Sequence, residues 1–251
     1  MDAKTVDTST TAWRQWQDSP WGRLRYALAE HNLARHLGDA PLRVLDLAGG
    51  DGSDAVRLAV RGHDVTVLDN SPAMLAAAAE RAAAAGVTIT RVEADIADLP
   101  ETAYDVVLCH NIVQYRDDAL ALALDALRPG GLLSVMAINR HAAPLVTAVR
   151  RLDPAAALAA LDTDQAHTAT FDTTITLYTA EDLSRLMRVS GCRVLAHYGI
   201  RAVCDYIADD ERKHDPAFYA DLERLELALT DREPHKHTAR LFQLVGRKDV
   251  P

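Results

Sequence analysis

The sequence predicts an α/β fold built as a doubly wound, mostly parallel sheet. Short β-branched runs alternate along the chain with alanine-rich runs of helical pattern, which is typical of strands joined by crossover helices. The apolar run from Val44 to Leu47 ends in a cluster of glycines and then enters a helical segment. A chain of 251 residues, 49% of them hydrophobic, is long enough to bury the core of one such domain.

Apolar periodicity places strands and helices in alternation as far as residue 138. The expected strands cover residues 43–47, 64–68, 88–92, 104–109 and 132–138, and the expected helices cover 22–37, 53–61, 72–85 and 117–127. Ser71 and Pro72 are a good helix start, because serine caps a helix and proline fits its first turn. The segment Arg128-Pro129-Gly130-Gly131 should end the last of these helices.

The alternation breaks between residues 139 and 178, a segment that we interpret as an inserted lid. Two helices, near 142–151 and 154–161, and a tail rich in threonine and aspartate are expected in it. After the lid we expect a helix at 180–190, a strand at 192–200, a helix at 216–229 and a strand at 238–245. The last two strands suit an antiparallel pair at an edge of the sheet. The chain, 1–251, is thus expected to be one domain with an N-terminal helical cover (1–40) and the lid (139–178).

Composition narrows the class of protein. Residues 1–11 are polar, and no stretch reaches the roughly 18 apolar residues that a membrane span requires, so we expect a soluble, cytoplasmic protein that binds no membrane. The few, distant cysteines should be reduced and mostly buried; they are Cys109, Cys192 and Cys204. No cysteine or carboxylate spacing supports a metal site at the C-terminal histidines, so no metal is expected; these are His214, His235 and His237.

Glycines at the end of the first expected strand form a turn suited to a nucleotide. Gly49, Gly50 and Gly52 let the backbone turn sharply and come close to a ligand. Residues 50–55, Gly-Asp-Gly-Ser-Asp-Ala, satisfy a dinucleotide fingerprint, and Asp69 follows near the distance expected for a ribose-binding acid. The turn alone therefore allows a dinucleotide-dependent oxidoreductase.

Acidic side chains around the turn favour a different ligand. Asp51 and Asp54 should repel a pyrophosphate, whereas the sulfonium and amino group of S-adenosylmethionine tolerate them. Asp46, at the strand end, also suits a cationic ligand. We therefore favour S-adenosylmethionine, as the donor of a methyltransferase or the ligand of a non-catalytic binding module.

Four ordered motifs resemble those of the class I S-adenosylmethionine-dependent methyltransferases. They are Asp46-x-Ala48-x-Gly50-x-Gly52, Asp69 ending the second strand, Ala94-Asp95 after the third, and Leu127-Arg128-Pro129-Gly130-Gly131 before the fifth. The resemblance implies a Rossmann-like sheet of seven strands. Ala48 stands where the family has its first glycine, which is tolerable if Ala48 keeps a negative φ.

Nearly the whole chain is similar to a narrower family, the bacterial tRNA methyltransferases that esterify the carboxyl of wobble 5-carboxymethoxyuridine. The shared segments are Gly22-Arg23-Leu24-Arg25, Arg61-Gly62-His63, Leu108-Cys109-His110-Asn111, Asn139-x-His141, residues 199–206 and residues 211–214. The resemblance implies that the methyl donor is bound by Arg25, Asp46, Ala48, Gly49, Gly50, Gly52, Asp69, Asn70, Ala94, Asp95 and His110.

The acceptor is a separate question. Where the tRNA enzymes have a run of lysines in the lid, residues 160–165 read Ala-Leu-Asp-Thr-Asp-Gln, and the formal net charge of the chain is −9. Because tRNA is held largely by neutralising its phosphates, this charge favours a polar small molecule such as a carboxylate. The pairs Arg150-Arg151 and Arg212-Lys213 could still bind phosphates, so tRNA stays the alternative.

Methyl transfer asks little of side chains, since most of its acceleration comes from positioning. A carboxylate acceptor needs a cation to orient it, which we assign to Arg201 with Arg140 as its partner. A hydroxyl or amine acceptor would need a base, and His110 or His141 could serve. His110 could equally stack near the adenine and make one hydrogen bond. The oligomeric state stays open.

Overall fold

The computed structural model describes residues 15–99, 103–168 and 172–250, so the polar segment 1–11 lies outside the described residues. A seven-stranded sheet has the order β3-β2-β1-β4-β5-β9-β8. The pairs β1–β2, β1–β4, β2–β3 and β4–β5 are parallel, which confirms the mostly parallel α/β fold. A second sheet contains the antiparallel pair β6–β7.

The chain divides into two compact units. The first, called here the glycine-turn unit, comprises Asn32–Met136, Leu183–Ala196 and Leu244–Pro251. The second, called the lid unit, comprises Met1–His31, Ala137–Asp182 and His197–Gln243. The expectation of a single domain stays a prediction.

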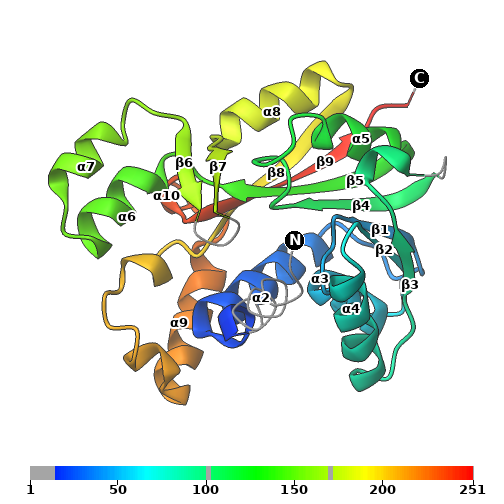
Figure 1. Cartoon of the computed structure of the whole chain (residues 1–251), viewed down its shortest axis with the longest axis horizontal. Coiled ribbons are helices and arrows are strands. Elements are labelled where there is room, and N and C mark those ends of the chain that lie inside the picture. The colour runs from blue at the N-terminus through cyan, green and yellow to red at the C-terminus, as the bar shows by residue number, and fades with distance from the viewer. Residues whose placement is uncertain (1–14, 100–102, 169–171, 251) are drawn as a thin grey trace. The chain divides into compact units, whose positions relative to one another are not determined.

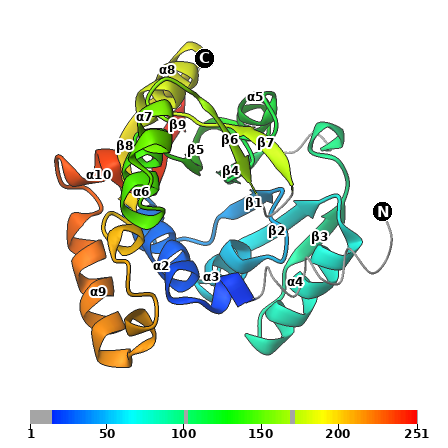
Figure 2. The same ribbon diagram turned by 60° about the vertical axis from the view of Figure 1, so that its left-hand side comes forward.

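The glycine-turn unit holds the alternating part of the chain (Figure 1). Its strands are β1 (Arg43–Leu47), β2 (Asp64–Asp69), β3 (Thr90–Glu93), β4 (Tyr104–His110) and most of β5 (Leu127–Ile138), and its helices include α3 (Ser53–Val60), α4 (Pro72–Ala84) and α5 (Ala119–Asp125). Figures 1 and 2 show α3 and α4 on one side of the strands and α5 on the other. Because both faces are covered, β1 and β4 are buried along most of their length and do not alternate between buried and exposed residues.

The segment from Leu127 to Gly131 differs from the prediction. It belongs to β5, and α5 already ends at Asp125. Leu127 pairs with Tyr104, and the register then shifts before Leu132 pairs with Val106. Pro129 has no N–H to donate and Gly130 has a φ of +74°, so both suit this irregular stretch of strand. Proline and glycine also end helices, so the local sequence predicted a helix end where the structure has a strand.

The lid unit contains the predicted helices and one unexpected hairpin (Figure 2). Its helices include α6 (Ala142–Arg150), α7 (Pro154–Ala159), α9 (Pro216–Leu229), α10 (His235–Thr238) and most of α2 (Pro20–Ala34). The threonine-rich tail forms the antiparallel strands β6 (Gln165–Thr168) and β7 (Thr173–Thr176), since β-branched threonine fits a pleated surface.

The last helix and strands follow the predicted order. They are α8 (Ala180–Val189), β8 (Cys192–Ile200) and β9 (Leu241–Lys248). Strand β9 begins three residues later than predicted because α10 occupies the preceding segment. The two strands are neighbours, with β8 at the edge of the sheet.

The cysteines are free and buried, as predicted. Burial raises the pKa of the Cys109 and Cys204 thiols to about 12 and that of Cys192 to about 11, so none is a reactive thiolate. Within the described ranges, no helix combines the length and apolar character needed to cross a membrane.

Candidate functional site

The glycine turn joins β1 to α3. Gly50 and Gly52 have φ values of +55° and +69°, in the left-handed region that glycine enters without steric cost. Gly49 is required for another reason, because a Cβ there would lie 2.6 Å from Cγ of Asp46. A Cβ on Gly50 would meet no described atom within 4 Å. The turn therefore leaves open space beside the Gly50 backbone, where a ligand can approach closely.

Ala48 departs from the prediction, because its φ is +54° rather than negative. The left-handed conformation brings an alanine Cβ close to the following carbonyl oxygen. Residue 48 thus has a backbone conformation that suits glycine although it is an alanine, because β1 and the glycine turn fix the chain on both sides.

Ala48→Gly should therefore raise the free energy of unfolding by about 0.5–1 kcal/mol, because relief of the steric contact outweighs the added entropy of the unfolded chain. Denaturant unfolding without ligand measures this effect. Gly86→Ala is the matched control, since Gly86 has a φ of +67° with open space around it, and it should lower stability by a similar amount. Equal or lower stability of Ala48→Gly would contradict the strain at this position.

Asp69 ties the end of β2 to the turn. Its Oδ2 accepts a hydrogen bond from the Gly50 N–H at 2.9 Å, and its Oδ1 accepts one from the Ser71 N–H at 2.9 Å. Burial raises its pKa, and the backbone hydrogen bonds oppose that rise. Each carboxylate oxygen has a second lone-pair direction, so Asp69 has the acceptor capacity to bind two hydroxyl groups as well.

The acids beside the turn have internal partners, which weakens the predicted repulsion of pyrophosphate. Asp51 is buried, forms an ion pair with Arg81 at 2.7 Å and accepts a hydrogen bond from Ser53 Oγ at 2.9 Å. Asp54 lies 2.9 Å from Nδ1 of His110. Both carboxylates have hydrogen-bond partners within the protein, so the turn by itself does not separate the two classes of ligand.

His110 is held at both ring nitrogens. Besides the contact with Asp54, its Nε2 lies 2.8 Å from Ser134 Oγ, and its side chain is 4% exposed. A neutral ring that donates from Nδ1 to Asp54 and accepts at Nε2 from Ser134 satisfies both contacts. To take a proton from an acceptor, His110 would have to release one of them. This geometry favours a positioning role over a catalytic one.

Ala94 and Asp95 follow β3. The Ala94 N–H donates to the Asp69 carbonyl at 3.2 Å. Asp95 accepts from the Ala97 N–H and pairs with Arg116 at 3.1 Å, and these contacts lower its pKa. The structure thus brings most of the predicted donor-binding residues to the carboxyl ends of β1 to β4; these are Asp46, Ala48, Gly49, Gly50, Gly52, Asp69, Asn70, Ala94, Asp95 and His110.

Sequence reasoning missed the partners of these residues. Arg81 and Arg116 lie about thirty and twenty residues from the acids with which they pair. Ser134 could have been found, because it is the polar residue within the apolar run 132–138, and a buried hydroxyl requires a partner.

The other predicted site residues belong to the lid unit. Arg25 is buried, with its guanidinium 4.3 Å from the ring centroid of Tyr26. Arg201 follows β8 with a φ of +63° and is also buried. Its Nε and Nη2 lie 3.0 and 3.2 Å from the two carboxylate oxygens of Asp205. This ion pair uses the planar fork that we expected to hold a carboxylate acceptor.

A buried carboxylate fixes the loop that follows Arg201. The backbone N–H groups of Ala202, Val203 and Cys204 donate to the carboxylate of Glu226 at 2.6, 3.0 and 2.7 Å. Glu226 projects from α9 and is fully buried. The loop therefore depends on a single side chain from another part of the sequence.

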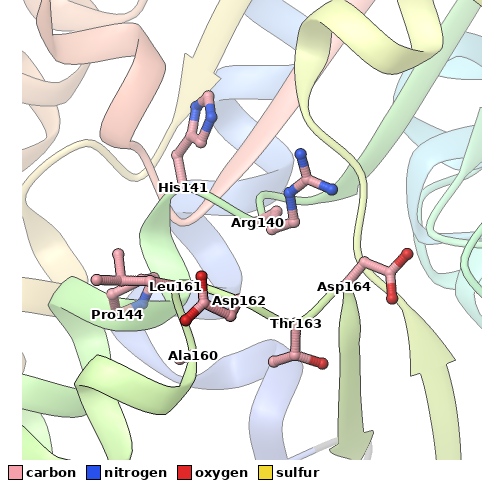
Figure 3. A pocket seen from close by; sticks show the side chains of 8 residues that line it. All are labelled: Arg140, His141, Pro144, Ala160, Leu161, Asp162, Thr163 and Asp164. Carbon is pink, nitrogen blue, oxygen red and sulfur yellow. The ribbon is translucent and has the colours of Figure 1, made fainter.

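A pocket of about 520 Å³ opens between the start of α6 and the segment that joins α7 to β6 (Figure 3). Its lining residues are Arg140, His141, Pro144, Ala160, Leu161, Asp162, Thr163 and Asp164. Arg140 lies 3.6 Å from Asp182. The Asp182 carboxylate also accepts a hydrogen bond from Thr179 Oγ1, at the start of α8. The pocket brings the predicted Arg140 and His141 together with Asp162 and Asp164.

One residue of each basic pair that could have bound phosphates is committed within the lid unit, whereas Arg151 and Arg212 are exposed. Lys213 is 2% exposed, and its Nζ lies 2.7 Å from Asp210. Arg150 pairs with the other carboxylate oxygen of Asp210 and donates to the Ile207 carbonyl at 2.7 Å. Among the described residues, no group of three or more side chains is placed to hold a metal ion.

Comparison with known proteins defines the class. Residues 44–131 match the family model of a methyltransferase domain. The chain is 30% identical over 244 residues to tRNA 5-carboxymethoxyuridine methyltransferase of Escherichia coli O157:H7, covering 90% of this chain and 89% of that protein. It is 33% identical over 171 residues to trans-aconitate 2-methyltransferase of Mycobacterium sp. (strain KMS), covering 64% of this chain and 62% of that protein. The structure of magnesium protoporphyrin IX methyltransferase from Synechocystis PCC 6803 has a TM-score of 0.62 at 16% identity, covering 99% of this chain and 100% of that chain.

The sheet order, the glycine turn and the domain match make this chain a class I S-adenosylmethionine-dependent methyltransferase. Within that class, it belongs to the family of tRNA 5-carboxymethoxyuridine methyltransferase, which it matches over nearly its full length. Membership in this family confirms the resemblance and rules out the oxidoreductase and the non-catalytic binding module as alternatives. It leaves the acceptor of this particular chain to be inferred from the site.

Proposed function

We propose that this protein transfers a methyl group from S-adenosylmethionine to the carboxylate of a polar small molecule bound in the lid-unit pocket. The observation that carries the proposal is the pocket itself, which is lined by Arg140 together with Asp162 and Asp164. Two relatives are named for acceptors that contain carboxyl groups, trans-aconitate and 5-carboxymethoxyuridine.

The glycine-turn unit fits the donor. The open space at Gly50 admits a ligand against the backbone, and Asp69 has lone pairs for the two ribose hydroxyls. Asp54 and Ser134 fix the ring of His110, so we assign His110 to the positioning of the donor and not to the role of a base. Arg25 is assigned to the donor by resemblance alone.

The chemistry needs orientation and no base. The bound donor supplies an electrophilic methyl group, whose bond to sulfur breaks with its electron pair left on sulfur as the carboxylate oxygen bonds to carbon. Arg140 is the residue that we assign to hold the carboxylate, because it lines the pocket and its ion pair with Asp182, at 3.6 Å, is too long for a hydrogen bond. Arg201 becomes a positioning residue, since Asp205 occupies its fork. His141 is the candidate base if the acceptor is a hydroxyl or an amine.

Methyl transfer to the carboxyl group of a wobble uridine in tRNA is the alternative, and the identity to the tRNA enzyme supports it. The net charge of −9, the acids of the pocket and the internal pairing of Arg150 and Lys213 favour the small molecule. A labelled donor and a cell extract distinguish the two. We expect label in the low-molecular-mass fraction, unaffected by ribonuclease, whereas tRNA binding should weaken about 10³-fold or more between 50 and 200 mM salt.

Arg140→Lys should lower kcat/KM for the labelled acceptor about tenfold or more, because lysine keeps the charge and loses the planar fork. Donor affinity should not change. Arg151→Lys, at the exposed end of α6, is the matched control and should be neutral. The rate should stay flat from about pH 6 to 9, because a carboxylate is already ionised. A rate that rises through a pKa near 6–7 and is lost in His141→Ala would show that the acceptor is a hydroxyl or an amine that must lose its proton, and not a carboxylate.

A further inference from the structure

The lid-unit pocket has charges of both signs on facing segments. Arg140 and His141 lie at the start of α6, and Asp162 and Asp164 lie in the segment between α7 and β6 (Figure 3). The guanidinium of Arg140 and the carboxylates of Asp162 and Asp164 together carry a net negative charge. A ligand bearing only carboxylates would match Arg140 and oppose the acids.

The acidic segment is held in place by its backbone. The Gln165 N–H donates to Thr163 Oγ1 at 3.1 Å, and the Leu177 N–H of the segment that follows β7 donates to the Asp164 carbonyl at 2.6 Å. Neither Asp162 nor Asp164 forms an ion pair within the described ranges, and the Asp164 side chain accepts only a 3.3 Å contact from Gln165. Both carboxylates therefore remain available to a ligand in the pocket.

From this arrangement we infer that the pocket selects a carboxylate that also carries a cationic amino group, with its carboxylate at Arg140 and its ammonium group at Asp162 and Asp164. The inference rests on the proposed function, whose acceptor class it narrows to amino-acid-like zwitterions. A pocket of about 520 Å³ lies in the size range of small-molecule sites. The same acids disfavour the phosphates of a nucleic acid.

The test uses matched pairs of acceptors that differ only in the cationic group. Each ω-amino carboxylate with three to six carbons is compared with the alkanoate in which a methyl group replaces the ammonium group. Binding is measured by calorimetry on protein saturated with S-adenosylhomocysteine, and turnover is measured separately with labelled donor. Wild-type protein should bind its best ω-amino carboxylate about tenfold or more tightly than the matched alkanoate.

Removal of the two pocket charges should remove that preference. The double variant D162N/D164N keeps side-chain size, and its affinity ratio for the matched pair should fall to about one while alkanoate binding is kept. The control D221N/E223Q makes the same change in net charge on α9, at one exposed and one half-buried position outside the pocket lining, and should keep the wild-type ratio. An unchanged ratio in D162N/D164N, or a wild-type preference for alkanoates, would overturn the inference.

Binding and turnover separate this inference from the proposed function. Binding with the expected preference but no methyl ester would keep the pocket assignment and reject the carboxylate reaction. Methyl ester formation with no preference between matched acceptors would keep the carboxylate reaction and reject the selection of a cationic amino group. If no member of the panel binds, the inference is overturned.

Discussion

Asp69→Ala should weaken binding of S-adenosylhomocysteine by roughly 2–4 kcal/mol, because two charge-assisted hydrogen bonds to the ribose hydroxyls are lost. The structure adds a second effect. Asp69 also accepts from the N–H groups of Gly50 and Ser71, so the variant loses two contacts that hold the turn. We therefore expect a decrease in stability of about 1–3 kcal/mol in the absence of any ligand.

Calorimetry on folded protein separates the two effects. Asp69→Asn is the informative companion, because one amide oxygen can still accept from Gly50 or Ser71 while the charge is gone. It should recover part of the stability and little of the affinity. Asp64→Ala, at the exposed start of the same strand, is the control for a lost acid on β2. Wild-type affinity in folded Asp69→Ala would reject Asp69 as the ribose-binding residue.

Glu226→Ala should destabilise the protein by about 3–5 kcal/mol, because it leaves three backbone N–H groups of a buried loop without their acceptor. Denaturant unfolding measures this loss. Glu226→Gln keeps the size and one acceptor oxygen, so its cost should be smaller. Glu223→Gln, half-buried on the same helix, has none of these hydrogen bonds and should have little effect. A loss below about 1 kcal/mol in Glu226→Ala would show that the loop finds other acceptors.

The pH dependence of stability gives a second readout for Glu226. Burial raises the pKa of this carboxyl above its ordinary value of 4.5 although the backbone hydrogen bonds oppose the rise. The folded state therefore binds the proton more tightly than the unfolded state. Stability should fall as the pH rises from 4.5 through the raised pKa, relative to Glu226→Gln, which has no proton to lose there. A constant difference between the two proteins across this range would contradict the raised pKa.

Local sequence patterns were sufficient for the glycine-turn unit. β1 has the predicted bounds, α3, α4, β2 and β4 differ by one residue at one end, and β3 begins two residues later than predicted. The donor residues could be predicted for the same reason, since each directly follows a strand, and the ends of neighbouring parallel strands meet at one edge of a sheet. The limits of local reasoning appear at Leu127–Gly131 and in the threonine-rich tail, where the pairing partner decided that the chain is a strand.

The sequence by itself determined the fold class, the turn and the class of enzyme, because periodicity and glycine placement are encoded by adjacent residues. Only the tertiary structure decided which charges are available. Arg201 is committed to Asp205, Lys213 is buried against Asp210, and Arg140 lines a pocket with two acids. The sequence shows all of these as charged residues near loops. An ion pair depends on where distant segments meet, and removing a charge from water requires a partner, so the fold rather than the residue type decides whether an arginine can bind a substrate.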